Sequence, residues 1–279
     1  MRDSRFFEGV DQVEIYADDP DLGGRLPIFY YDTAMMLALF PARYRAVRDL
    51  LPDPRFVPAR LAPGLGVVAV ACLEHRDTDI GPYGEVGIAI PLDDATSRLN
   101  LPGRALWNAE RHEQSHAFVV HLPVTTEVAL RGGIEFYGFP KFLGEIGFEG
   151  TGAEQTCGLG RRGEHILTLT GEKLRTGRGG ETQFFFHLWM DRQPQRTEFK
   201  VSRLEMGRSL RPGAATLELD ERHPIARELG RLLVSRRSLR YDYVPRAEAI
   251  LYGPDRFTVP LLRRIMATTT DATRSQMAA

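Results

Sequence analysis

Features that mark several specialised classes of protein are scarce or absent in this 279-residue sequence. No apolar run approaches the roughly 18 residues that a membrane-spanning helix needs. The two cysteines, Cys72 and Cys157, are too few for a disulfide framework, and Cys72 lies in an apolar run typical of a small core residue. The N-terminus lacks the apolar core of a signal peptide. We therefore expect a cytoplasmic protein that neither contacts nor spans a membrane.

Excess charge of one sign is also absent. The 36 basic and 37 acidic residues give a formal net charge of −1, whereas a general nucleic-acid binder carries a basic face. The hydrophobic fraction of 43% and the charged fraction of 26% are those of an ordinary globular protein. The composition therefore predicts no nucleic-acid partner.

Lysine is the scarcest functional side chain. Only Lys141, Lys173 and Lys200 are lysine among the 36 basic residues, and the other 33 are arginine. Lys141 lies in the aromatic and glycine-rich segment 136–144, where an ammonium is costly unless it loses its proton or finds a partner. A neutral ε-amine is a nucleophile towards carbonyl carbon, whereas arginine stays charged. The sequence therefore predicts a Schiff-base lysine at position 141.

The order of predicted elements indicates one α+β domain with an antiparallel β core and peripheral helices. Residues 1–24 are polar and predict an N-terminal arm or lead-in, residues 25–255 form the domain, and residues 256–279 predict a helix and a disordered tail. No internal repeat and no linker rich in proline, glycine or serine divides the chain.

Short stretches rich in apolar and β-branched residues predict most of the strands. They are 65–73, 85–92, 116–122, 143–148, 155–158, 165–170, 183–190, 198–205, 215–219 and 239–251. Helices are predicted at 41–51, with a proline in the first turn, and at 224–234, with apolar residues on one side. A short helix is predicted at 125–130, stopped by Gly132 and Gly133, and a polar loop at 76–84.

One glycine motif resembles a nucleotide site. The segment 158–163, GLGRRG, matches the dinucleotide pattern G-x-G-x-x-G, which functions between a strand and a helix whose N-terminus holds the pyrophosphate. Residues 164–170 instead alternate with the period of a strand. We therefore interpret the glycines as a hairpin turn and predict no cofactor.

A second motif resembles a zinc site. The segment 112–116, HEQSH, matches H-E-x-x-H, in which His112 and His116 would share a helical face and bind zinc, with Glu113 as the base. Residues 108–115 are polar apart from Ala109, which leaves no apolar face to bury a helix, and a β-like run begins at Ala117. We interpret the segment as a solvated loop that enters a strand and predict no metal. A zinc hydrolase is the alternative.

The segment 133–144, GIEFYGFPKFLG, resembles the Schiff-base lysine motif of the acetoacetate decarboxylase superfamily. That motif runs Gly-Arg-Glu, a small and an aromatic residue, Pro-Lys-Lys and Leu-Gly. Three further segments are similar to the family in the same order. They are PDP at 52–54, YGEVGIAIP at 83–91 and VPRAEAI at 244–250. The similarity covers roughly residues 26–253.

The resemblance implies a closed antiparallel β-cone or barrel flanked by helices, assembled into a homo-oligomer. It implies that Lys141 forms the imine and that Glu85 is the pocket carboxylate, for which we expect a proton-shuttling role. It also implies a small keto acid as the substrate.

The sequence departs from the family pattern at four positions. Phe142 stands where the family's decarboxylases carry a second lysine, a neighbouring cation of the kind that activates such a nucleophile. Ungapped spacing from Glu85 puts the family's second active-site glutamate near Val70, and its substrate-binding arginine falls near Thr33. Ile134 replaces the arginine of the motif.

Without the second lysine, activation of Lys141 has to come from desolvation by neighbouring aromatic rings. We expect Tyr137, four residues before Lys141, to donate to a substrate carbonyl, with a packed core tyrosine as the alternative. The predicted substrate-binding residues are Tyr137, Phe139, Phe142, Phe136 and Val70.

These departures leave the reaction open. An imine with a β-keto acid lets CO2 leave, and an imine with pyruvate gives an enamine for aldol addition and dehydration. We hypothesise a Schiff-base C–C lyase that acts on a keto acid through Lys141. The alternative is a non-catalytic binder of an apolar carboxylate inside the cone.

Overall fold

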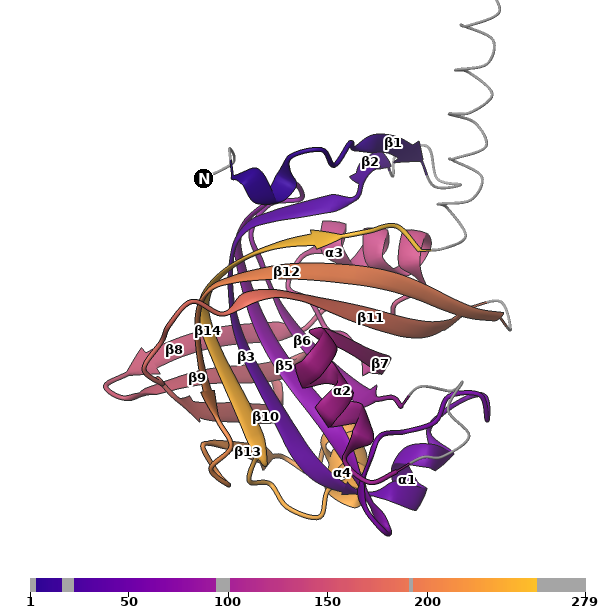
Figure 1. Ribbon diagram of the computed structural model, residues 1–279, viewed down its shortest axis with the longest axis vertical. Helices are drawn as coiled ribbons and strands as arrows, with labels where there is room; N and C mark the ends of the chain where they lie inside the picture. Colours follow the sequence, from indigo (N-terminus) through magenta and orange to yellow (C-terminus); the bar gives the residue numbers. More distant parts are fainter. Residues whose placement is uncertain (1–3, 17–22, 94–100, 191–192, 255–279) are drawn as a thin grey trace, which may run out of the picture.

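The computed structural model describes residues 4–16, 23–93, 101–190 and 193–254, and its centre is a closed β-barrel (Figure 1). The largest sheet has the strand order β3-β14-β12-β11-β7-β6-β5-β4. Its strand β3 also pairs with β5, which closes a barrel of seven strands and leaves β4 outside. The predicted closed barrel with peripheral helices is confirmed. One pair, β7 with β11, is parallel rather than antiparallel.

The barrel strands differ widely in length, and the longest extend well past the strands predicted from the sequence. Their bounds, with β4, are β3 Ile28–Arg43, β4 Arg60–Ala62, β5 Leu65–Thr78, β6 Tyr83–Pro91, β7 Gln114–His121, β11 Gly180–Met190, β12 Gln193–Ser209 and β14 Arg240–Leu251. A second sheet, ordered β13-β10-β9-β8, contains β8 Glu145–Thr151, β9 Glu154–Arg161, β10 Glu164–Glu172 and β13 Ala215–Leu219. A two-stranded ribbon joins β1 Val13–Tyr16 to β2 Gly23–Leu26.

Alternation along the strands gives the barrel wall two different faces. Even-numbered residues of β5, such as Val68 and Val70, are buried in a core shared with the second sheet, where they meet residues such as Leu159 and Ile166. Odd-numbered residues of the same strand, such as Ala71, line the interior of the barrel. Because successive side chains point to opposite faces of a strand, one wall separates an outer hydrophobic core from an inner cavity.

The helices lie outside the barrel wall or over its ends (Figure 1). They are η1 Arg5–Phe7, α1 Tyr44–Asp49, α2 Arg104–His112, α3 Glu127–Gly132, the π-helical turn η2 Gly133–Tyr137, and α4 Pro224–Leu232. Within the described residues, no helix combines the length and the apolar character that crossing a membrane requires.

One strand near the N-terminal end of the domain is not among those predicted, and two predicted boundaries differ from the structure. The strand β3 begins at Ile28 and includes Pro41, so the helix predicted at 41–51 begins only at Tyr44 and ends at Asp49. The strand is buried on both faces over much of its length, which removes the alternation that identifies a half-buried strand. Residues 76–78, predicted as loop, are the end of β5.

Gly132 and Gly133, at the junction of α3 and η2, do not stop the helix as predicted. The chain continues through Gly132 and Gly133 into the π-helical turn η2, and it leaves helical geometry at Gly138, whose φ is 73°. This turn brings the chain to Lys141. The hairpin predicted at 158–163 is confirmed, because β9 and β10 pair across Arg162 and Gly163, whose φ values are 54° and 75°, but Gly158 and Gly160 lie within β9 and not in the turn.

The predicted arm and tail are only partly described. Phe7 of the arm packs on Phe29 of β3, with ring centroids 4.9 Å apart, and β1 pairs with β2. The predicted C-terminal helix and tail at 256–279 lie outside the described residues.

Candidate active site

A buried lysine–glutamate pair lies at one end of the barrel interior. Nζ of Lys141 donates to Oε2 of Glu85 at 2.9 Å, and the two side chains are 6% and 13% exposed. Glu85 comes from β6, and an isolated bridge joins it to Val124, which follows β7. The segment that carries Lys141 is held beside this bridge, because the Val124 amide donates to the Phe142 carbonyl at 3.0 Å. The backbone thus fixes both partners.

The pair opens into a cavity of about 200 Å³ inside the barrel. The walls are mostly apolar because the inward residues of β5 and β6, such as Ala71, Leu73 and Ala89, are small or aliphatic. Lys141 also borders a second hollow of about 50 Å³ beneath the β1–β2 ribbon. A charged pair in such surroundings has little water to compete with a carbonyl ligand.

Two buried tyrosines line the smaller hollow together with the lysine. Tyr30 and Tyr83 share a hydrogen bond of 3.1 Å between their hydroxyl oxygens, and Nζ of Lys141 lies 5.8 Å from the Tyr83 ring centroid. Burial raises the pKa of Tyr30 and that of Tyr83, with the charge of Glu85 adding to the effect. Both phenols therefore stay protonated, and whichever of them accepts the shared hydrogen bond keeps a hydroxyl hydrogen that can be donated to a substrate oxygen.

His75 is a candidate functional residue that the sequence interpretation missed. It lines the cavity on β5, its ring lies between Tyr30 and Tyr83 at centroid distances of 4.6 and 4.5 Å, and its Nδ1 bonds Thr33 Oγ1 at 3.0 Å. Within the described residues its buried Nε2 has no hydrogen-bond partner. Burial, and then the charge of Lys141, lowers the pKa of His75 to about 3. The ring is therefore neutral at physiological pH.

Because His75 is neutral in the folded protein, the free energy of unfolding depends on pH. An unfolded histidine titrates near pH 6.5, so the unfolded chain binds the extra proton between about pH 6.5 and 3, and stability falls as the pH falls through that window. Between pH 7 and 5 we expect the wild type to lose ~2 kcal/mol more stability than His75→Gln, measured by urea denaturation. The exposed His165→Gln should keep the wild-type loss. An undiminished loss in His75→Gln would contradict the buried neutral ring.

The predicted aromatic neighbours of Lys141 lie in three different surroundings. The Phe139 ring centroid is 5.7 Å from Nζ of Lys141 and lines the cavity. Phe136 and Tyr137 line the smaller hollow, and the Tyr137 hydroxyl donates to the Leu251 carbonyl at 3.5 Å. Phe142 lies against the outer core, with the Arg161 guanidinium 4.6 Å from its ring centroid. Of these rings, Phe139 borders both the lysine and the cavity.

The two positions inferred from ungapped spacing have other roles in the barrel. Val70 is fully buried on the outer face of β5, so it does not line the cavity, whereas Ala71 and Leu73 do. Leu73 pairs directly across the ladder with Glu85. Thr33 is also fully buried, and it orients His75. For Val70, the ungapped spacing therefore leads to the outer face of β5 instead of the cavity face.

The H-E-x-x-H segment lacks the helical context of a zinc site. The helix α2, which the sequence interpretation missed, ends at His112, and Glu113 has a left-handed φ of 52°. His116 lies on β7, where its Nδ1 bonds His187 Nε2 at 3.1 Å. Within the described part of the chain, no three His, Cys, Asp or Glu side chains form a group that could hold a metal ion.

Comparisons with known proteins agree with this architecture. The family model of acetoacetate decarboxylase matches residues 18–253, which confirms the resemblance found in the sequence. None of the curated proteins matches the chain. Among solved structures, an acetoacetate decarboxylase matches with a TM-score of 0.57 at 15% identity, covering 82% of this chain and 88% of that chain.

Two further structures are similar. The acetoacetate decarboxylase from Legionella pneumophila has a TM-score of 0.56 at 15% identity and covers 81% of this chain and 86% of that chain. The enduracididine biosynthesis enzyme MppR, in complex with the condensation product of pyruvate and imidazole 4-carboxaldehyde, has a TM-score of 0.55 at 14% identity, with 82% and 88% covered. At these identities the likeness establishes the shared fold.

Proposed function

Since the chain belongs to the acetoacetate decarboxylase family, we propose that it is an imine-forming C–C lyase that acts on a keto acid through Lys141. The observation that carries the proposal is the contact between Nζ of Lys141 and Oε2 of Glu85 at 2.9 Å, buried at the end of an apolar cavity. An amine can form an imine only when it is neutral, and a carboxylate at hydrogen-bond distance can take up its proton.

The proposed reaction begins with transfer of a proton from Lys141 to Glu85. The neutral amine adds to the ketone carbon, and the carbonyl oxygen leaves as water with one proton returned by Glu85 and one from the adding nitrogen, while the tyrosine pair can donate a hydrogen bond to that oxygen. Tyr30 and Tyr83 support this step because burial keeps their hydroxyl groups protonated. The positively charged imine then withdraws electrons from the neighbouring carbon.

Two fates of the imine are consistent with the site. With a β-keto acid, the bond to the carboxylate breaks, its electron pair forms an enamine, and CO2 leaves. With pyruvate, loss of a methyl proton forms the enamine, which can attack an aldehyde before water is lost. The complex of MppR with a pyruvate condensation product supports considering the second fate in this fold.

Borohydride reduction tests the imine directly. We expect incubation with acetoacetate or pyruvate followed by reduction to attach one substrate-sized group to the peptide that contains Lys141. Lys200 is a matched internal control, because it also pairs with a glutamate, at 2.8 Å from Glu181, but its side chain is 29% exposed. If no keto acid of a broad panel leaves an adduct on Lys141 after reduction, the proposal is excluded.

A glycine beside the lysine offers a test that substitutes neither Lys141 nor Glu85. A Cβ on Gly133 would lie 2.5 Å from both Cδ and Cε of Lys141, whereas a Cβ on Gly132 would meet Phe136 at 3.8 Å, an ordinary contact. Both glycines have helical backbone angles, so alanine adds no backbone strain. We expect Gly133→Ala to slow imine trapping about 100-fold by displacing Nζ, and Gly132→Ala to trap at the wild-type rate. Equal rates in the two variants would contradict the required placement of the amine.

The mainly apolar wall also favours a second function, a non-catalytic carrier of an apolar carboxylate. Its signature would be saturable binding of a fatty acid without any adduct on Lys141 after reduction with keto acids.

A further inference from the structure

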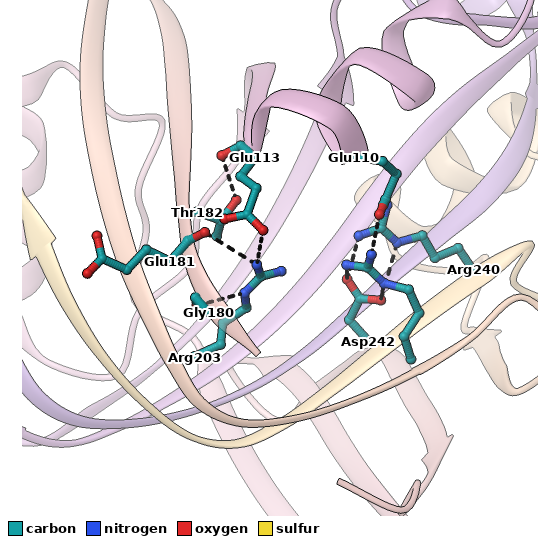
Figure 2. A network of polar contacts seen from close by, with 9 residues as sticks. Glu110, Glu113, Gly180, Glu181, Thr182, Arg203, Arg240 and Asp242 are labelled. Carbon is teal, nitrogen blue, oxygen red and sulfur yellow. Dashed lines mark hydrogen bonds and ion pairs between the residues drawn. The ribbon is translucent and has the colours of Figure 1, made fainter. Parts of the chain in front are cut away.

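The cavity has a second polar end, formed by arginines around α2 and the start of β7 (Figure 2). The described lining residues include Arg203, Arg208 and Arg240. Arg208 and Arg240 contact Glu110 of α2, and Arg203 faces Glu113, the residue that follows this helix. Three guanidinium groups on one wall of a largely apolar cavity indicate a place for an anion.

The strand β7 runs from this end of the cavity to the end that holds Lys141. Glu85 bridges to Val124 just after β7, whereas Arg203 contacts Glu113 just before it. The strand has eight residues and therefore measures ~26 Å at ~3.3 Å per residue. The wall between the two ends is apolar, and it includes Ala71, Leu73, Ala89, Val119, Phe184 and Phe186.

Two of the three arginines already have close carboxylate partners. Arg208 binds both oxygens of Asp242 at 2.7 and 2.9 Å. Arg240 binds the same two oxygens at 3.2 and 2.7 Å, and both guanidinium groups also reach Glu110. These bidentate pairs satisfy Arg208 and Arg240.

Arg203 lies in a different situation, although its side chain is only 11% exposed. Its Nε and Nη2 donate to the carbonyls of Gly180 and Glu181 at 3.3 and 3.4 Å, and Nη2 lies 3.7 Å from Oε1 of Glu113. Burial lowers the pKa of Arg203, but a guanidinium stays charged at neutral pH. A largely buried cation with long contacts gains more from a new carboxylate than its paired neighbours do.

We propose that Arg203 binds a carboxylate of the substrate while the carbonyl group of the same substrate reaches Lys141. The ~26 Å between the two ends of the cavity is reduced by the tilt of the strands to the barrel axis and by the long side chains of Arg203 and Lys141. The substrate therefore joins its two groups by an apolar chain of roughly four to six methylene groups. This inference rests on the proposed imine chemistry for the carbonyl end only. For a β-keto acid, the carboxylate at Arg203 is a second one, apart from the group that leaves as CO2.

Calorimetric measurement of octanoate binding tests the anion site alone, because octanoate has no ketone or aldehyde group that could form an imine. We expect Arg203→Gln to weaken octanoate binding roughly 10- to 100-fold, Arg203→Lys to weaken it less, and Arg222→Gln to bind as the wild type does. Arg222 is a matched control because its side chain is 91% exposed. Unchanged octanoate binding in a folded Arg203→Gln, or no binding by the wild type, would overturn the proposal.

Borohydride trapping of 7-oxooctanoate and of its methyl ester then tests whether one substrate uses Arg203 and Lys141 together. We expect the wild type to be labelled at Lys141 at a lower concentration of the acid than of the ester, and Arg203→Gln to lose this difference while it still traps the ester. Equal labelling by acid and ester in the wild type would overturn the assignment of Arg203. Octanoate binding that depends on Arg203, without any adduct on Lys141, would instead retain the anion site and exclude the imine chemistry.

Discussion

Lys141→Arg is expected to lower the turnover of a keto acid by about 10⁴-fold or more, because a guanidinium cannot supply the neutral nitrogen that forms an imine. Arginine retains a positive charge next to Glu85, so the buried carboxylate keeps a partner and the loss reports on chemistry. The measurement is the consumption of acetoacetate or pyruvate, paired with circular dichroism to show that the variant is folded.

Chemical rescue extends this prediction, because rebuilding an amine at position 141 should restore the activity. Lys141→Cys should be as inactive as the arginine variant, and alkylation of the new thiol with 2-bromoethylamine should restore activity by rebuilding an amine at nearly the same reach. Cys72 and Cys157 are fully buried, so they are shielded from the reagent in the folded protein. Lys200→Arg is the control at an exposed lysine–glutamate pair and should keep full activity. Substantial turnover by Lys141→Arg would contradict the nucleophile assignment.

The central pair could be predicted because it depends on residue type and on ordered motifs. A lone lysine in an aromatic segment, together with the similar segment around Glu85, identified two side chains that lie 2.9 Å apart although they are 56 positions distant in the chain. The rest of the site depends on how strands pair. His75 and Arg203 have no motif, and they face the cavity only because β5 and β12 present those positions to the interior.

The same reason explains the misplaced positions. Val70 was chosen by counting back from Glu85, and the count takes no account of where the hairpin between β5 and β6 turns. The ladder pairs Glu85 with Leu73, so a shift of one residue decides between the cavity and the outer core. A count along the sequence cannot supply that register, because the turn and the bulges set it.

The sequence predicts those elements whose apolar pattern matches the face that they bury in the fold. The strand 215–219 and the helix that begins at Pro224 follow their expected periodicity. The sequence does not indicate α2 because the helix contains no buried residue, and two of the apolar side chains with which it lines the cavity, Ala105 and Leu106, lie before the polar stretch that indicates a loop. Its stability comes from the barrel end that it covers, and a local pattern does not contain that contact.

Glu85→Gln is expected to separate imine formation from the later steps. The amide is nearly isosteric and can still accept a hydrogen bond from Lys141, but it cannot carry a proton, so turnover should fall roughly 10²- to 10⁴-fold. Loss of the carboxylate also removes the partner of a buried ammonium, which favours the neutral amine. Borohydride should therefore still label Lys141 with substrate to the wild-type final extent in this variant, but at a slower rate because Glu85 no longer transfers the protons that imine formation needs.

The matched control for Glu85→Gln is Glu181→Gln, which removes the carboxylate from the exposed pair with Lys200 and should change neither readout. The two readouts also distinguish a catalytic role from a structural one. If Glu85 only held Lys141 in place, its removal would reduce the final extent of trapping together with turnover, whereas loss of a proton carrier lowers the rates of imine formation and turnover and leaves the final extent of trapping unchanged. Wild-type turnover in Glu85→Gln would assign the proton transfer to another group, and the neutral His75 and the Tyr30–Tyr83 pair are the neighbours with protons to exchange.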